Sequence, residues 1–155
     1  MTRSIILTLP ALFVAACATV PVPPTTTGGP NFLSRDAASK GVHTTSSGLQ
    51  YFVVQLGPKG GASPVSGDTV NFDYEGKLTS GDVFDSSFQR GTPISGTVDS
   101  FVPGFNEALK LMRPGAEWVV WIPPALGYGD RAIGPIPASS VLRFRLALHA
   151  VRRPG

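Results

Sequence analysis

Apolar and polar side chains alternate with a period of two residues along three stretches of the chain. The apolar positions are Val70, Phe72 and Tyr74; Ala116, Trp118, Val120 and Ile122; and Leu142, Phe144, Leu146 and Leu148. Successive side chains of a β-strand point to opposite faces, so this pattern predicts strands with one buried face. Such strands are typical of an antiparallel sheet covered on one side. The segment Thr79-Ser80-Gly81-Asp82 is predicted to be a turn between two of them.

One segment follows a helical period instead. Its apolar residues stand at positions i, i+3, i+4 and i+7: Phe105, Ala108, Leu109 and Met112. Pro103 suits the first turn of a helix, and Arg113-Pro114-Gly115 suits its end. We therefore expect an α+β fold, with a curved antiparallel sheet of about five strands wrapped around one short central helix. This domain is predicted over residues 48–155.

Residues 1–16 have the features of a secretory signal: one positive charge at Arg3, an apolar run, and small residues before Cys17. The run is shorter than the ~20 residues of a membrane-spanning helix. The segment Val14-Ala15-Ala16-Cys17 resembles the bacterial lipobox, whose cysteine carries lipid after cleavage. Cys17 is the only cysteine, so no internal disulfide forms. The alternatives are an ordinary secretory signal or an uncleaved anchor, each with an incidental cysteine.

Between the signal and the domain we expect two further segments. Residues 17–30 hold the lipidated cysteine and a Pro/Thr/Gly-rich tether that cannot bury a core. Residues 31–47 are a leader in which 31–41 are predicted to form a short helix. Ala18, rather than Asp, follows Cys17. The lipobox resemblance then implies a lipid anchor in the cell envelope, at the outer membrane and facing the periplasm.

The charge balance indicates no nucleic-acid partner. The net charge is +3, and it falls to +2 when Arg3 is removed with the signal. Arg143 and Arg145 alternate with apolar residues, so they are expected on the solvated face of a strand. His43 and His149 are far apart in the sequence with no second ligand beside either, so no metal site is expected.

Four separated segments bring aromatic or branched apolar residues next to turns. They are Asp82–Arg90, Phe101–Phe105, Trp121–Gly129 and Ile136-Pro137, and Phe144 follows on the last strand. None sets a nucleophile beside a base, so the layout predicts an apolar pocket for a small ring rather than a hydrolytic site. Carboxylates that could suggest a glycosidase include Asp73 and Glu75, but alternation places these two on the face opposite Tyr74.

In their order along the chain and in their residues, these segments resemble the sequence motifs of the FKBP-type peptidyl-prolyl cis-trans isomerases, over about residues 31–151. The resemblance implies catalytic roles for Tyr74, Phe84, Asp85, Tyr128 and Phe144. It implies substrate contacts for Arg90, Phe101, Val102, Phe105 and Ile136. Phe105 falls where the family usually has a tryptophan at the pocket floor, and the loop before Ile136 is compact.

The function implied by the resemblance is isomerisation of X–Pro bonds in envelope proteins, with no cofactor or metal. The expected partners are proline-containing unfolded or folding proteins, the membrane through Cys17, and macrolide inhibitors. The protein itself is expected to be a monomer. The alternative is an FKBP-like chaperone or protein-binding module with weak or no catalysis. Some of these residues could instead serve the fold alone. Phe105 and Phe144 could be ordinary core residues, and Tyr74 and Asp85 could form a structural hydrogen-bonded pair beside Arg90.

Overall fold

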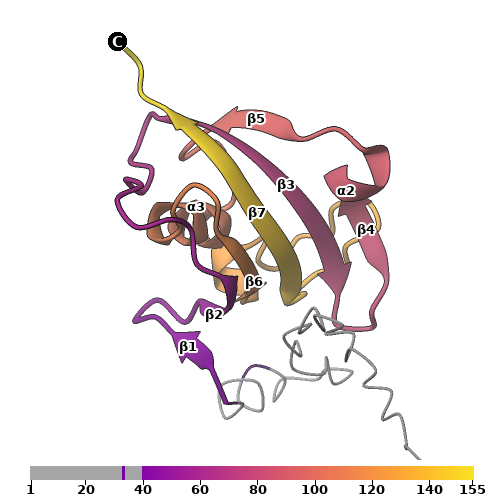
Figure 1. Cartoon of the computed structure of the whole chain (residues 1–155). Helices are drawn as coiled ribbons and strands as arrows, with labels where there is room; N and C mark the ends of the chain where they lie inside the picture. Colours follow the sequence, from indigo (N-terminus) through magenta and orange to yellow (C-terminus); the bar gives the residue numbers. More distant parts are fainter. Residues whose placement is uncertain (1–32, 34–39) are drawn as a thin grey trace, which may run out of the picture.

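The alternating stretches form one antiparallel sheet in the computed structural model, which describes Leu33 and residues 40–155. Its strands are β1 (Val42–Thr44), β2 (Gln50–Gln55), β3 (Thr69–Leu78), β4 (Val83–Ser86), β5 (Ile94–Thr97), β6 (Glu117–Ile122) and β7 (Leu142–Arg152). The strand order is β1-β2-β6-β7-β3-β4, and β5 also pairs with β3 (Figure 1). The predicted signal sequence, Cys17, the tether and most of the helix predicted over 31–41 lie outside the described residues.

The α+β class predicted from the sequence is confirmed, but the sheet has seven strands where about five were expected. Two of the strands, β1 and β5, have only three and four residues. So few residues show no period, and only their backbone pairing with β2 and β3 defines them. β1 lies within the predicted leader, which therefore contributes an edge strand to the sheet.

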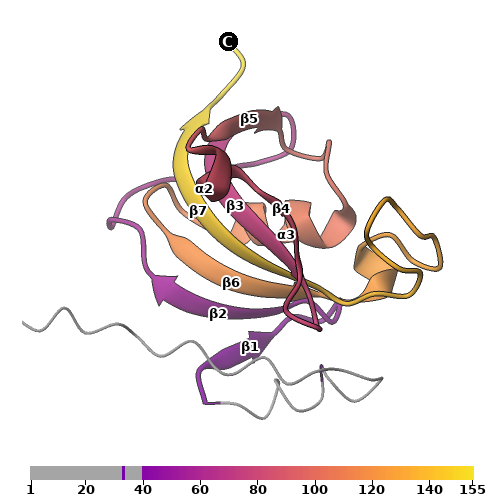
Figure 2. The same cartoon turned by 90° about the vertical axis from the view of Figure 1, so that its right-hand side faces the viewer.

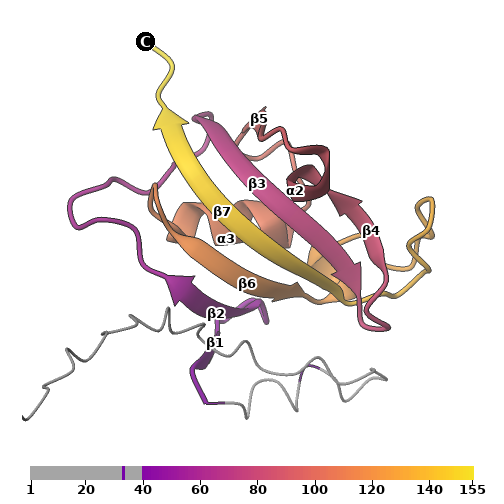
Figure 3. The same cartoon turned by 45° about the vertical axis from the view of Figure 1, so that its right-hand side comes forward.

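The predicted helix is α3 (Pro103–Leu111), and it lies across the concave face of the curved sheet (Figures 2 and 3). Pro103 occupies its first turn, as predicted. Ala108, Leu109 and the cap residue Met112 are fully buried against the sheet, and Phe105 is 5% exposed. Burying this stripe is what stabilises so short a helix, because about nine residues are marginal alone.

The other face of β6 is also buried, which the alternation did not predict. Val119 is 1% exposed and Trp121 is 0% exposed. Both pack in a second apolar cluster with partly buried residues from the leader, β1, β2 and the position just before β7: Leu33, Val42, Phe52, Val54 and Val141. Leu33 and Val42 of the leader thus help to cover the convex side of the sheet at β6, which a period-two pattern cannot reveal.

The edge strand beside β3 is divided into β4 and β5 by a short helix, α2 (Ser87–Arg90). The Ser86 side chain accepts a hydrogen bond from the Gln89 N–H and so caps the start of α2. Gly91 ends it in the left-handed region at φ 67°. This interruption lets two strands pair with successive halves of β3 and sets Arg90 beside the sheet.

Among the described residues, no helix has both the length and the apolar character needed to span a bilayer.

Candidate functional site

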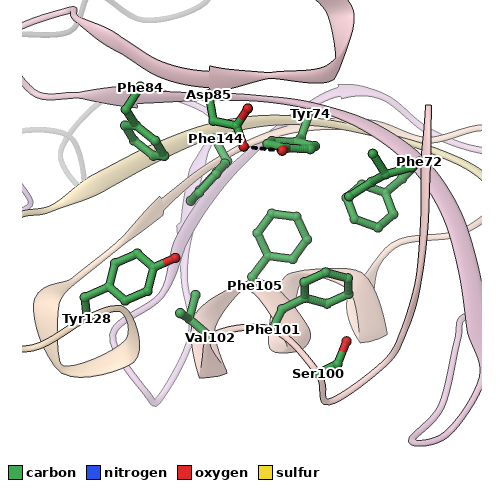
Figure 4. Close-up of a pocket in the computed structure, with 11 residues that line it drawn as sticks. Phe72, Tyr74, Phe84, Asp85, Ser100, Phe101, Val102, Phe105, Tyr128 and Phe144 are labelled. Carbon is green, nitrogen blue, oxygen red and sulfur yellow. Dashed lines mark hydrogen bonds between the residues drawn. The ribbon is translucent and has the colours of Figure 1, made fainter. Parts of the chain in front are cut away.

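An aromatic pocket of about 470 Å³ opens between α3 and the concave side of the sheet (Figure 4). A volume of this size suits a small-molecule or side-chain ligand. Its lining comes from β3, β4, β5, β7, α3 and two loops: Phe72, Tyr74, Phe84, Asp85, Ile94, Ser100, Phe101, Val102, Phe105, Tyr128 and Phe144. Seven of these eleven side chains are Phe and Tyr rings, and they come from several elements that only the folded chain brings together.

Phe105 forms the centre of the pocket floor. Its ring centroid lies 5.1 Å from those of Phe101 and Phe144 and 5.4 Å from that of Phe72. The ring of Phe144 stands perpendicular to that of Phe105, and Phe84 stands nearly perpendicular to Phe144. Edge-to-face packing of this kind is the arrangement that aromatic quadrupoles favour. The rings therefore support each other and hold a preformed apolar surface.

The loop that carries Phe101 and Val102 is tied to α3 by a buried amide. Asn106 donates from Nδ2 to the Phe101 carbonyl at 2.7 Å and accepts from the Asp99 N–H at 3.0 Å. It is 7% exposed, so both groups of its amide find partners inside the protein. Asp99 adopts a positive φ of 80°. Asn106 thus fixes the shape of the loop, a role that the helical pattern alone did not predict.

A polar cluster forms one wall of the pocket. The Tyr74 hydroxyl donates to Asp85, and Arg90 donates both to Asp85 and, at 3.0 Å, to the Tyr74 oxygen. Partial burial works against ionisation of Asp85, but hydrogen bonds from Tyr74 and Arg90 outweigh it and lower the pKa of its carboxyl. Burial and the hydrogen bond to Asp85 raise the pKa of Tyr74. Asp85 is therefore held ionised at neutral pH, and Tyr74 keeps its proton.

The two aromatic rings on this wall need a glycine behind them. A Cβ atom on Gly76 in β3 would lie 2.5 Å from the Phe84 ring and 2.8 Å from the Phe144 ring. The bare backbone of Gly76 allows both rings to pack closely over the strand. A larger residue here would therefore clash with both rings unless they moved.

Tyr128 lies at the rim of the pocket, just after η1 (Pro124–Leu126). Its side chain is 37% exposed, and Figure 4 shows its hydroxyl directed toward the open space between the rings. A phenol in this position is a hydrogen-bond donor at the edge of an apolar surface.

Eight of the ten residues predicted for the site line this pocket: Tyr74, Phe84, Asp85, Phe101, Val102, Phe105, Tyr128 and Phe144. Arg90 stands behind the wall and contacts Asp85 and Tyr74. Ile136 is 5% exposed and belongs to the hydrophobic core, outside the pocket lining. The roles of all ten remain predictions at this point.

Three lining residues were not predicted: Phe72, Ile94 and Ser100. Phe72 shares a face of β3 with Tyr74, so the alternation itself could have identified it. Ile94 stands in a strand of four residues and Ser100 in a turn, where sequence pattern carries no such signal.

The lining holds few groups able to react. The Ser100 hydroxyl donates to the Thr97 carbonyl at 2.6 Å, and no histidine, cysteine or lysine lines the pocket. Asp85 is engaged by two donors. Within the described part of the chain, three or more His, Cys, Asp or Glu side chains nowhere gather as metal ligands would. The arrangement can bind and orient an apolar group, and it lacks a nucleophile next to a base.

Such a fold and site define a class of small α+β proteins with an aromatic pocket between a curved sheet and a helix. Residues 60–149 match the family described as FKBP-type peptidyl-prolyl cis-trans isomerase. This match covers more than half of the chain, and the chain belongs to the FKBP family, as its sequence predicted.

Individual relatives agree with this membership. The chain is 42% identical over 123 residues to peptidyl-prolyl cis-trans isomerase Mip of Coxiella burnetii, covering 79% of this chain and 53% of that protein. It is 40% identical over 126 residues to outer membrane protein MIP of Legionella longbeachae, covering 81% and 53%. The crystal structure of FkpA from Escherichia coli superposes with a TM-score of 0.76 at 39% identity, covering 79% of this chain and 57% of that one. The chain thus spans about half the length of the curated relatives it matches.

Proposed function

We propose that this protein is a peptidyl-prolyl cis-trans isomerase that accelerates rotation of X–Pro bonds in proteins of the cell envelope. The observation that carries the proposal is the preformed aromatic pocket around Phe105, in a chain that belongs to the FKBP family. The substrates would be unfolded or folding polypeptides with an exposed proline.

The physics of the reaction fits this pocket. Rotation about a peptide bond meets a barrier of ~18–20 kcal/mol because the C–N bond is partly double. Twisting the bond removes the resonance and with it much of the charge separation of the amide. An apolar surface therefore stabilises the twisted amide relative to the planar one, which is the differential binding that catalysis requires. In this proposal the rings of Phe84, Phe105 and Phe144 provide that surface.

The polar groups would orient the substrate. The exposed Tyr128 hydroxyl is available to donate to a substrate carbonyl at the rim. Asp85 would accept weak contacts from the substrate while Tyr74 and Arg90 hold it in place. Phe101 and Val102 would contact the substrate backbone, and Ile136 would support the loop above the site from within the core. No covalent step is involved, and no metal or cofactor is required.

A proline-isomerisation assay on an X–Pro peptide tests the proposal. We expect the unaltered protein to accelerate isomerisation, and Tyr128→Phe and Phe84→Ala to reduce kcat/KM. Tyr51→Phe is the matched control for the loss of a phenol, because Tyr51 stacks between His43 and Trp118 outside the pocket. Absence of catalysis in the unaltered, folded protein would contradict the proposal and favour the chaperone or binding-module alternative.

We further propose that the mature protein is a monomer anchored by lipid on Cys17 at the outer membrane, facing the periplasm. The lipobox-like segment before Cys17 supports the anchor. The name of the Legionella longbeachae relative, an outer membrane protein, supports the location. Macrolides that fill an aromatic pocket of this kind are proposed as inhibitors.

A further inference from the structure

A β-bulge distorts β7 on the face of the sheet that points away from the pocket. Asn71 pairs with Ala150 and Phe72 with Leu148, so His149 is an extra residue in β7. A bulge leaves its extra residue out of the regular ladder and redirects the side chain. His149 Nε2 lies 2.8 Å from Asp73 Oδ2. The bulge therefore brings an imidazole onto a carboxylate of the neighbouring strand.

Asp73 in turn contacts a fully buried serine. Ser87 is 0% exposed, and its hydroxyl donates to Asp73 Oδ1 at 2.6 Å. Ser87 Oγ in turn accepts a hydrogen bond from the backbone N–H of Tyr74 at 2.9 Å. Burial works against ionisation of Asp73, but hydrogen bonds with Ser87 and His149 outweigh it and lower its pKa. The carboxylate is thus a constant acceptor that fixes the direction of the Ser87 hydroxyl.

This chain of contacts reaches the pocket by two routes. Tyr74 carries the phenol that donates to Asp85, so its backbone position sets that hydrogen bond. Ser87 is the first residue of α2, and Arg90, which contacts both Asp85 and Tyr74, is the last. Both sides of the polar wall therefore depend on where Ser87 is held.

The neighbouring charged groups form pairs of their own. On the same face, Glu75 pairs with Lys77 at 2.7 Å, and Arg145 pairs with Glu117 at 2.6 Å. Within the described part of the chain, neither pair forms a hydrogen bond with Ser87 or with the backbone of Tyr74. Asp73 is the carboxylate of this face that connects to the pocket.

We propose that Asp73, held in place by the bulged His149, is a positioning residue that acts through Ser87 on Tyr74 and α2. Its role in catalysis rests on the isomerase function proposed above. Asp73 does not touch the substrate; it keeps the buried Ser87 hydroxyl oriented, and Ser87 keeps the Tyr74–Asp85–Arg90 wall in register with the aromatic floor.

The test compares Asp73→Ala with Asp73→Asn, whose amide oxygen still accepts from Ser87. For Asp73→Ala we expect kcat/KM for a prolyl peptide to fall roughly 3- to 10-fold through lost orientation. We expect Asp73→Asn to recover most of this loss. The Tyr74 amide should exchange its hydrogen about tenfold faster in Asp73→Ala, because its acceptor is no longer fixed. Glu75→Ala, on the same face of the same strand, is the control and should change neither quantity.

The proposal is wrong if folded Asp73→Ala matches Glu75→Ala in both catalysis and exchange of the Tyr74 amide. If the unaltered protein has no isomerase activity, the proposed function fails, and the exchange rate of the Tyr74 amide decides the positioning role by itself. If Asp73→Ala does not fold, His149→Ala replaces it, since the His149 side chain is 43% exposed. That variant should accelerate exchange of the Tyr74 amide in the same direction, and an unchanged rate would overturn the proposal.

Discussion

At the scale of single residues, the polar wall of the pocket depends on an ionised carboxylate that two donors hold. The pKa of Asp85 is lowered, so its hydrogen bonds favour the folded state only while the group is ionised. A lowered pKa in the folded state stabilises the protein above the unfolded pKa of about 3.9 and loses that effect as pH falls through the folded pKa. At pH 6–8 the charge of Asp85 does not change.

From this we predict that Asp85→Asn lowers isomerase activity by less than about 100-fold, the smallest loss typical of removing a general acid or base. The rate should stay nearly flat between pH 6 and 8 in both proteins, because Asp85 orients its neighbours and moves no proton. Acid unfolding monitored by fluorescence should show a weaker pH dependence below about pH 4 in the variant. A bell-shaped rate profile that disappears in Asp85→Asn would identify an acid or base instead.

Phe105 belongs both to the hydrophobic core and to the lining of the pocket. It packs against the rings of Phe72, Tyr74, Phe101 and Phe144 and is 5% exposed. We predict that Phe105→Leu weakens ligand binding and lowers the free energy of unfolding by ~1–2 kcal/mol, since much of its volume is kept. Phe105→Trp should stay folded and bind macrolides at least as tightly as the unaltered protein.

Ligand titration beside thermal unfolding measures both effects of the Phe105 changes. If Phe105→Leu loses stability while substrate and ligand binding stay unchanged, Phe105 is only a core residue. Unfolding of Phe105→Trp would equally contradict the assignment of the pocket floor.

At the scale of elements, the pocket depends on β5, a strand of four residues. The Phe101 ring packs directly on its backbone: a Cβ atom on Gly96 would lie 2.4 Å from Phe101 Cζ. Phe101 also meets Phe72 edge-on at 5.5 Å, so the ring is held from two sides. The position of a short edge strand therefore sets the position of a pocket ring.

We predict that Gly96→Ala displaces the Phe101 ring and lowers ligand affinity while the protein remains folded. A methyl group at this distance from a ring must move the ring, because protein interiors leave no spare volume. Ligand titration and the ring signals of Phe101 in an NMR spectrum measure the outcome. Ser95→Ala, at the preceding position of β5, is the control. Equal ligand affinities for the two variants would show that the Gly96 backbone does not position the Phe101 ring for binding.

At the scale of the whole molecule, the folded domain and the membrane would be connected through the segment that precedes residue 40. We predict that the mature protein begins at Cys17 and partitions with membranes, since two or more acyl chains give a stable anchor. Cys17→Ser should release soluble protein or leave the precursor uncleaved. Mass spectrometry of the amino terminus and membrane fractionation measure this. An intact Arg3 end, or soluble protein with an unmodified Cys17, would contradict the anchor.

Local sequence determined those elements whose signals lie within a few residues. The alternation along β3 and β7, the core-facing positions of β6 and the stripe of α3 follow from burying the face of each element that meets the main core. Pro103 and the turn at 79–82 mark boundaries because their backbone preferences are local. The aromatic residues of the pocket, except Phe72, could be predicted because the motifs that carry them resemble a family.

Tertiary structure decided what depends on contacts between distant segments. Trp121 is buried because Leu33, β1, β2 and Val141 pack over it, and the period of β6 is the same whether or not that cover exists. The strands β1 and β5 exist because longer strands offer them hydrogen-bonding partners. Ser87 contacts Asp73 across 14 residues of sequence, and His149 contacts Asp73 only because β7 pairs with β3 and is bulged at that point. The sequence alone gives the side chains that are present, and the register of strand pairing in the folded sheet decides which of them are in contact.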